Sequence, residues 1–252
     1  MNFYPKNYAI ALQKISFHWK SQLILDRISF QVPSGNIVSL LGPSGCGKST
    51  LLHIIAGLLQ PDSGDICIHG EEQTNRTGSM GYMQQNDLLF PWKTIVENAA
   101  LPLVINGIPK KKALQKASRC FPDFGLEGYE HYLPNELSGG MRQRAALLRT
   151  YMMDKKIILL DEPFGALDSL TRKKMQIWLL DMYEMLNSTI ILVTHDIEEA
   201  IYLSDTILVM SALPGKIVHV VESTTPRNKR KKETYLNNEM LAMKKEIVTL
   251  FM

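Results

Sequence analysis

Residues 42–50 read Gly-Pro-Ser-Gly-Cys-Gly-Lys-Ser-Thr, and this stretch decides the fold. An apolar run precedes it at residues 37–41, and a second, helix-like apolar run follows it at residues 51–56. The glycines let the backbone curl so that several N–H groups point at one polyphosphate, and the following helix directs its positive end at the same charge. The sequence therefore predicts a nucleotide-binding loop between a buried strand and a helix.

Within this loop, the residue types predict the contacts. Lys48 reaches the β- and γ-phosphates, and the hydroxyl of Ser49 lies on a magnesium ion. Cys46 lies inside the loop, where we expect its thiol to make the protein sensitive to alkylation. The predicted nucleotide contacts of the loop are Gly42, Pro43, Ser44, Gly45, Cys46, Gly47, Lys48, Ser49 and Thr50.

Two carboxylates end another apolar run, which reads Ile-Ile-Leu-Leu-Asp-Glu at residues 157–162. Such a run is typical of a buried parallel strand whose carboxyl end faces a ligand crevice. Asp161 would hold the magnesium through water, and Glu162 is placed to polarise an attacking water as the general base. The alternative is a solvated strand end without a chemical role.

A second anion site is predicted at residues 137–144, which read Leu-Ser-Gly-Gly-Met-Arg-Gln-Arg. Ser138 caps a helix whose first-turn amides are left uncovered by Gly139 and Gly140. One nucleotide cannot easily use two half-sites that lie far apart in one chain. The sequence therefore favours a head-to-tail dimer, with ATP between the loop of one copy and Ser138 of the other. The alternative is a plain N-capped helix.

Taken together, these motifs resemble those of the ATP-binding subunit of ABC transporters over about residues 10–220. The resemblance implies ATP and Mg2+ as cofactors and ATP hydrolysis as the activity. It implies that Gln85 contributes to the metal site and to catalysis, and that His195 contacts the γ-phosphate and holds the general base in place. It also implies that Asp168 belongs to the D-loop, residues 166–168, which takes part in nucleotide binding.

Two implied assignments have competitors in the sequence. Trp19 would stack on adenine, but it could equally be a core aromatic at a strand end, and Phe17 is a second candidate for the stacking. Gln84 directly precedes Gln85, so the assignment of Gln85 rests on its spacing to the Pro-Trp pair at residues 91–92.

The predicted fold class is α/β, a P-loop NTPase (RecA-like) with a parallel core, an antiparallel β subdomain and a helical subdomain. Alternating segments at residues 9–15 and 24–32 suit antiparallel strands, and residues 64–70 suit a further short strand. A helical insert at about residues 92–152 separates the two halves of the core. A helix is also predicted at residues 171–186, with an apolar face made of Met175, Trp178, Leu179, Met182 and Leu186.

Composition agrees with a cytoplasmic enzyme. The chain has 252 residues, 45% of them hydrophobic, and a net charge of +3, so one domain of ordinary core size is expected. Its three cysteines show neither pairing nor metal spacing, which favours a reducing compartment. We find no apolar stretch long enough to cross a membrane and no signal peptide. Attachment to the cytoplasmic face of the membrane, as a peripheral protein, would therefore come through a partner.

An importer is the favoured type of transporter. Residues 88–92, Leu-Leu-Phe-Pro-Trp, resemble the nitrate, sulfonate and taurine importer branch, which also serves pyrimidine-type precursors. Leu89, Phe90 and Trp92 would form a groove for a coupling helix, and the alternative is that they cover the helical insert. The implied partners are a second copy, two transmembrane permease subunits and, indirectly, an extracytoplasmic solute-binding protein. A subunit of an exporter, or of an importer with a different solute, is the alternative function.

Nucleic acid is not an expected partner, because an ATPase of DNA repair would need a long coiled-coil insert before residue 137. The chain is divided into an ATP-binding domain at residues 1–220 and a tail at residues 221–252. The tail carries a basic run at residues 227–232, followed by the apolar residues Leu236, Met240, Leu241, Met243, Ile247 and Leu250. It is either a linker with a docking helix or a contact to anionic lipid headgroups.

Overall fold

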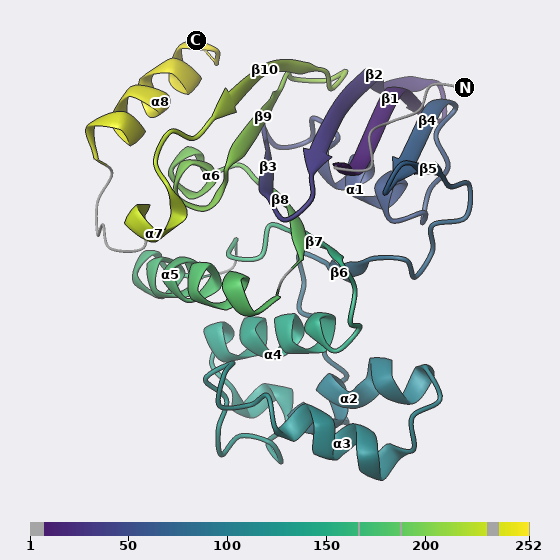
Figure 1. Ribbon diagram of the computed structural model, residues 1–252, viewed down its shortest axis with the longest axis vertical. Coiled ribbons are helices and arrows are strands. Elements are labelled where there is room, and N and C mark those ends of the chain that lie inside the picture. Colours follow the sequence, from purple (N-terminus) through teal and green to yellow (C-terminus); the bar gives the residue numbers. More distant parts are fainter. Residues whose placement is uncertain (1–7, 166, 187, 231–236, 252) are drawn as a thin grey trace.

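The computed structural model describes residues 8–165, 167–186, 188–230 and 237–251. Some predictions rest in part on residues outside this set, because Ala166 belongs to the D-loop and Leu236 to the apolar face of the tail. The side chain of Leu186 and residues 231–232 of the basic run are also outside it. Two sheets lie together at one end of the molecule, and a group of helices extends away from them (Figure 1).

The larger sheet has six strands in the order β10-β9-β3-β8-β7-β6. Neighbouring strands from β9 to β6 are parallel, and β10 runs antiparallel to β9. The central strands β3, β7 and β8 are buried along their whole lengths, which is why their sequences read as unbroken apolar runs. The strands of this sheet are β3 (Ile37–Leu41), β6 (Gly81–Met83), β7 (Ile157–Asp161), β8 (Thr189–Thr194), β9 (Thr206–Met210) and β10 (Ile217–Glu222).

The second sheet is antiparallel, with the order β2-β1-β4-β5, as predicted for the first part of the chain. Its strands are β1 (Tyr8–Trp19), β2 (Gln22–Pro33), β4 (Ser63–Ile68) and β5 (Glu71–Glu72). The strand predicted at residues 64–70 begins one residue later and ends two residues later than β4. His69 and Gly70 have φ angles of 51° and 82°, so the chain turns there instead of continuing the strand.

The six-stranded sheet is covered on both faces. Successive side chains of a strand point in opposite directions, so each buried strand contributes to two cores. Ile37 and Leu41 of β3 belong to the core that contains the helices α4 to α6. Val38 and Leu40 belong to the other core, which lies between this sheet, α1 (Lys48–Ile55) and the antiparallel sheet. The apolar runs recognised in the sequence therefore supply both cores.

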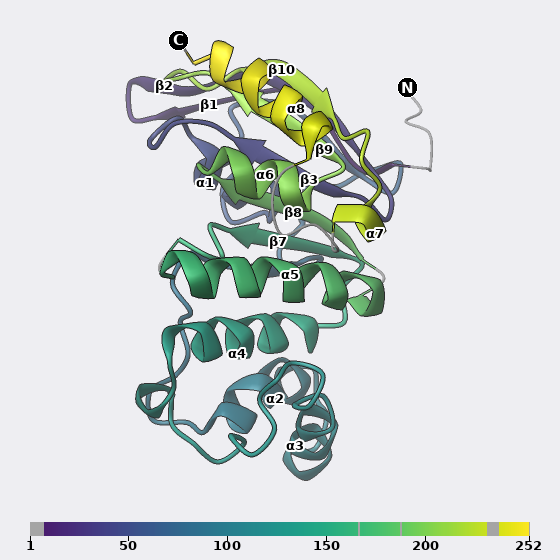
Figure 2. The same cartoon turned by 90° about the vertical axis from the view of Figure 1, so that its left-hand side faces the viewer.

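Helices α2 to α4 lie within residues 92–152, whose assignment as an insert remains a prediction, and α5 follows outside that range. Figures 1 and 2 show α2 and α3 farthest from the sheets, α4 next to them, and α5 between α4 and the six-stranded sheet. A capping box between Thr94 and Glu97 starts α2, and Pro109 precedes the charged helix α3. The elements are α2 (Ile95–Ile105), α3 (Lys110–Ser118), the 3-10 turn η1 (Pro134–Glu136), α4 (Gly139–Tyr151) and α5 (Ser169–Leu186).

Helix α5 begins at Ser169, two residues earlier than predicted, because Asp168 accepts hydrogen bonds from the backbone N–H groups of Leu170 and Thr171. On the predicted apolar face, Met175, Leu179 and Met182 are buried, and Trp178 is partly buried against the same core.

The end of the chain is folded onto the core. Helix α8 (Asn238–Thr249) buries Met240, Met243 and Ile247 beside α6 (Ile197–Leu203). Arg227 and Arg230, on the short helix α7 (Arg227–Arg230), both pair with Asp205. For the described residues, these contacts favour the docking helix over the lipid contact.

The predicted boundary between residues 220 and 221 falls inside β10. The two-part division of the chain remains a prediction. None of the helices in the described ranges combines the length and the apolar character that a membrane span requires.

Candidate nucleotide-binding site

Three neighbouring strands bring the predicted motifs to one edge of the sheet. β3 runs into the phosphate-binding loop, β7 ends at Asp161, and His195 follows β8, which lies between them. Because parallel strands end at the same edge, segments that are far apart in the sequence meet there.

The loop has the backbone shape that phosphate binding needs. Gly45 and Gly47 have φ angles of 79° and 101°, which residues with a side chain rarely adopt. A Cβ on Gly45 would meet no atom within 4 Å, whereas one on Gly47 would lie 2.8 Å from the Leu25 side chain. Helix α1 follows without a side-chain cap and without an acidic residue in its first turn. Its first N–H groups are therefore available to an anion.

Lys48 lies across this loop. Its Nζ donates hydrogen bonds to the carbonyl oxygens of Gly42 and Pro43, at 2.8 and 2.9 Å, and the residue is only 5% exposed. Among the described residues, no ion pair neutralises the ammonium group. Its charge is therefore held at the loop and is available to a phosphate.

Ser49 and Asp161, two of the predicted metal ligands, are in contact. The Ser49 hydroxyl donates to Asp161 Oδ1 at 3.1 Å, and the Tyr82 hydroxyl donates to Asp161 Oδ2 at 3.4 Å. Burial raises the pKa of Asp161, and the bond from Ser49 partly offsets that effect. A hydroxyl and a carboxylate are oxygen donors of the kind that Mg2+ prefers, and a cation here would offset the cost of burying the charge. These residues fit a magnesium ion.

The three predicted catalytic residues also gather. Gln85 Nε2 donates to Glu162 Oε2 at 3.2 Å, and His195 Nδ1 lies 3.3 Å from the same oxygen. Glu162 has a φ angle of 45°, although it is not a glycine, and its N–H donates to the Val193 carbonyl on β8. Strained backbone of this kind costs about 1 kcal/mol or more and is frequent at functional sites. Gln85 therefore lies at the predicted base, and no described contact joins it to Ser49 or Asp161.

The other predicted nucleotide contacts lie elsewhere in the chain. Ser138 accepts a hydrogen bond from the Met141 N–H at 3.3 Å and so caps α4, as predicted. Asp168 caps α5. Within the described ranges, no hydrogen bond or ion pair joins Ser138, Gly139, Gly140 or Asp168 to the phosphate-binding loop. Figure 1 shows α4 and α1 on opposite sides of α5 and β7.

The aromatic candidates for adenine stacking differ in exposure. Trp19, at the end of β1, is 59% exposed, whereas Phe17 is buried. Their ring centroids lie 6.5 Å apart. Of these two residues, Trp19 is the one that can offer a ring face to a base without a change of structure.

Cys46 is buried and free, and burial raises the pKa of its thiol. Alkylation needs an accessible thiolate. The structure therefore contradicts the expected sensitivity to alkylation. The prediction was wrong because the position of Cys46 in a loop did not reveal that its side chain points into the core.

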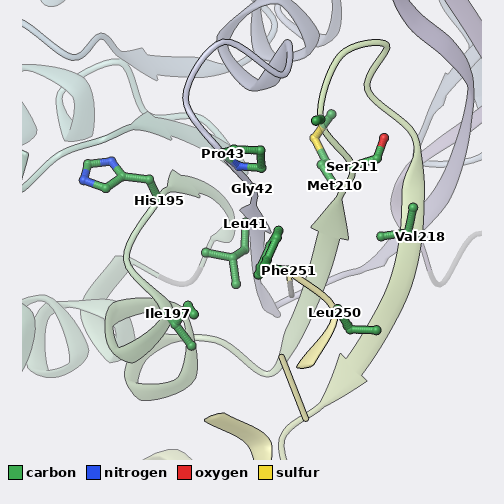
Figure 3. Close-up of a pocket in the computed structure, with 11 residues that line it drawn as sticks. Leu41, Gly42, Pro43, His195, Ile197, Met210, Ser211, Val218, Leu250 and Phe251 are labelled. Carbon is green, nitrogen blue, oxygen red and sulfur yellow. The ribbon is translucent and has the colours of Figure 1, made fainter. Parts of the chain in front are cut away.

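A pocket of about 610 Å³ borders the site (Figure 3). Pro43 and His195 line one side of it, and Met210, Val218 and Phe251 line the other. Its walls are mostly apolar. No sequence pattern indicates this pocket, because one wall comes from the far end of the chain.

Several polar residues beside the site were missed by the sequence reasoning. Tyr82 contacts Asp161, and Arg172 pairs with Asp196 at 3.5 Å. Glu199 is buried on α6, and burial raises its pKa to about 8. Acidic residues in the first turn of a helix usually indicate only a favourable interaction with the helix end. The sequence therefore does not predict that Glu199 is buried whereas Glu198 is exposed.

The fold and this site define a P-loop nucleotide-hydrolysing protein. The chain matches the ABC transporter family over residues 25–165. It is 44% identical to the aliphatic sulfonates import ATP-binding protein of a Bacillus cereus strain, over 86% of this chain and 87% of that protein. It is 43% identical to the formylaminopyrimidine import ATP-binding protein of Halalkalibacterium halodurans, over 96% of this chain and 95% of that protein.

Among solved structures, the chain resembles the dimeric structure of an ATP-binding cassette in a post-hydrolysis state, bound to ADP and Pi. The TM-score is 0.75 and the identity is 29%, over 86% of this chain and all (100%) of that one. The chain therefore belongs to the ABC transporter family. The predicted fold class and the predicted ABC-type ATPase are both confirmed.

Proposed function

We propose that two copies of this chain close head to tail on two MgATP, hydrolyse them, and so power a pair of membrane permease subunits that import a small solute. The gathering of Gln85, Glu162 and His195 beside the phosphate-binding loop carries this proposal, because a carboxylate held by an amide and an imidazole is suited to activating a water molecule. The protein would lie peripherally on the cytoplasmic face of the membrane.

The side chains at the site have distinct tasks. Lys48 and the N–H groups of the loop bind and orient the phosphates. Ser49 and Asp161 would hold Mg2+, with Gln85 as a further ligand once it leaves Glu162. The ion neutralises charge on the β- and γ-phosphates when bound.

Glu162 would take a proton from the attacking water. Among the described residues, both side-chain partners of Glu162 contact the same oxygen, Oε2, which leaves Oε1 for the water. Its side chain is only 16% exposed, which limits competing bulk water. His195 orients the carboxylate and would also reach the γ-phosphate.

The second half-site supports a shared arrangement. Ser138 caps a thirteen-residue helix that begins with Gly139 and Gly140 and has no acidic residue in its first turn. The helix end is thus suited to an anion, but this chain's own phosphate-binding loop makes no described contact with it. Phosphate held by a second copy is the ligand that a head-to-tail pair would place there.

The loop after Gln85 supports docking of a membrane subunit. Trp92 is 72% exposed, and its ring lies 5.2 Å from that of Phe90. Asn98 is fully buried and holds this loop, because it accepts from the Phe90 N–H at 2.7 Å and donates to the Phe90 and Lys93 carbonyls. A firmly held, exposed tryptophan is typical of a binding surface. Leu89, in contrast, is buried, so it supports the loop and does not line a groove.

Two relatives are named for the import of aliphatic sulfonates and of formylaminopyrimidine. They support import of a nitrate, sulfonate, taurine or pyrimidine-precursor type of solute, delivered by an extracytoplasmic binding protein. Uptake by the reconstituted membrane complex with its binding protein would test import. Efflux without that protein would favour the exporter alternative.

Mixed dimers test the shared site. Ser138→Arg and Lys48→Ala should each abolish hydrolysis, and a mixture of the two proteins should recover part of it, because one heterodimer contains one intact composite site. Glu162→Gln should keep ATP binding, lower turnover about a hundredfold or more, and trap the closed dimer. If proven heterodimers stay inactive, the site is not shared.

Trp92→Ala tests coupling. The variant should bind ATP normally, yet lose assembly with the permease subunits or uncouple hydrolysis from transport, because loss of an aromatic anchor costs about 2 kcal/mol or more. Leu241→Ala, at a 43% exposed apolar position on α8, is the control and should transport normally. Normal transport by the Trp92 variant would remove this residue from the coupling surface.

A further inference from the structure

Arg172 joins two loops that the catalytic scheme leaves unconnected. It lies in the first turn of α5, where its Nη2 donates to the Leu167 carbonyl at 3.0 Å. Its Nη1 lies 3.5 Å from Asp196 Oδ2. One guanidinium therefore contacts both the segment before α5 and the segment before α6.

The first of these segments touches the start of α4. A Cβ on Gly139 would lie 3.6 Å from the Leu167 side chain, and one on Gly140 would lie 3.0 Å from the Thr171 side chain. Helices α4 and α5 lie side by side in both views (Figures 1 and 2). Movement of the Ser-Gly-Gly segment would thus displace Leu167, whose carbonyl binds Arg172, and Thr171, which precedes Arg172 on α5.

The second segment leads to the proposed base. Asp196 directly follows His195, and its carboxylate accepts from the Glu199 N–H at 3.1 Å, which caps α6. The Asp196 N–H donates to the Thr194 hydroxyl at 3.0 Å. Both the backbone N–H and the carboxylate of Asp196 are therefore held by hydrogen bonds. A displacement of the carboxylate by Arg172 would move the adjacent backbone, which positions His195.

Arg172 is the cation in direct contact with Asp196, and Lys173 feels the Asp196 charge only at longer range. In the part of the chain that the structure describes, no other cation forms an ion pair with Asp196. Lys173, the next residue, lies over the Tyr202 ring at 3.8 Å. Glu199 also faces this cluster, but burial raises its pKa to about 8, so near neutral pH it is mostly protonated and competes little for the guanidinium.

We propose that Arg172 is a positioning residue that couples the two ATP sites of the dimer. This inference rests on the proposed function, in which Ser138 to Gly140 act on the partner's ATP while His195 and Glu162 act on the chain's own. The planar guanidinium has donors in a fixed geometry, so it transmits a shift of the Leu167 carbonyl to Asp196. Closure at one site then sets the position of His195 at the other.

The experiment compares steady-state ATP hydrolysis by the wild type, Arg172→Met and Arg172→Lys over a range of ATP concentrations. Arg172→Met should keep the Kd for ATP within about twofold, lower kcat about tenfold, and reduce the Hill coefficient to about one. Arg172→Lys keeps the charge near Asp196 but loses the fork, so it should be intermediate. Lys174→Met is the control, because this residue is exposed on the same helix, and it should behave as the wild type.

Asp196→Asn completes the test, because asparagine still caps α6 but lacks the charge. The double variant with Arg172→Met should be no slower than Arg172→Met alone, and additive losses would overturn the proposal. If Arg172→Met fails to fold in a thermal melt, Arg172→Lys and Asp196→Asn decide the question. Unchanged kcat and Hill coefficient in both would overturn it.

Different results would contradict the proposed function and the role of Arg172. A wild-type protein without ATP-dependent dimers or hydrolysis would contradict the proposed function itself. A wild-type dimer that hydrolyses ATP without cooperativity, or an Arg172→Met dimer as cooperative as the wild type, would contradict only the role of Arg172.

Discussion

Gly215 offers a sharp test of how the phosphate-binding loop is supported. This residue lies between β9 and β10, where its N–H donates to the Ile24 carbonyl at 2.8 Å and its carbonyl accepts from the Asp26 N–H at 3.0 Å. A Cβ at this position would overlap the backbone carbonyl oxygen of Cys46, and it would lie 2.9 Å from the end of the Met210 side chain. Gly215→Ala must therefore displace the loop or the turn that supports it.

The expected effect follows from these contacts. The Met210 side chain can move aside, but the Cys46 carbonyl is backbone between two glycines that shape the loop. Overpacking of this kind typically costs about 1 to 3 kcal/mol. If the loop yields, that strain appears as a weakening of ATP binding by about tenfold to a hundredfold.

Calorimetric titration with a non-hydrolysable ATP analogue measures the affinity, and a thermal melt measures stability. Lys216→Ala is the control, because it removes the Lys216–Asp26 ion pair in the same turn but adds no atom near the loop. It should bind the analogue as the wild type does. A folded Gly215→Ala protein with wild-type affinity would refute the reasoning, because it would show that the turn and not the loop absorbs the strain.

Three further predictions concern buried groups. Glu199 has an ordinary pKa of 4.5 and a folded pKa of about 8, so the folded state keeps a proton that the unfolded chain releases, and stability falls as the pH rises through this window. In urea denaturation, Glu199→Gln should therefore gain stability over the wild type from pH 5 to pH 8, and a pH-independent difference would contradict the assignment. Asp205→Ala should lose about 3 kcal/mol of unfolding free energy, because it leaves the Arg230 guanidinium, 1% exposed, without its carboxylate; a loss below about 1 kcal/mol in the same assay would show that the pair contributes little. Iodoacetamide should modify the partly exposed Cys120 before the buried Cys46 and leave ATP hydrolysis largely intact, and mass spectrometry of the labelled protein would reveal the opposite order.

Local sequence patterns predicted the elements that local physics controls. The glycines of residues 42–50 specify a loop whatever lies around it, because only glycine readily adopts the φ angles found at Gly45 and Gly47. Ser138 caps its helix because the serine hydroxyl satisfies a backbone N–H nearby in the sequence. The apolar runs of β3 and β7 likewise predicted buried strands.

Patterns of hydrophobicity did not fix what each side chain would contact. Leu89 and Trp92 stand in the same apolar segment, yet one is buried and the other is 72% exposed, because Asn98 folds the loop back on itself. Cys46 looked accessible in the loop, but its side chain belongs to the core beneath it.

By itself, the sequence determined the phosphate-binding loop, the strand and the helix that flank it, and the types of side chain available for the site. Only the tertiary structure decided which of those side chains meet. Gln85 and Glu162 are 77 residues apart and meet because β6 and β7 are neighbours in the sheet. Arg172 reaches Asp196 for the same reason, since α5 and α6 pack together. Such contacts depend on the spatial order of strands and helices. The residues next to a side chain in the sequence do not predict that order.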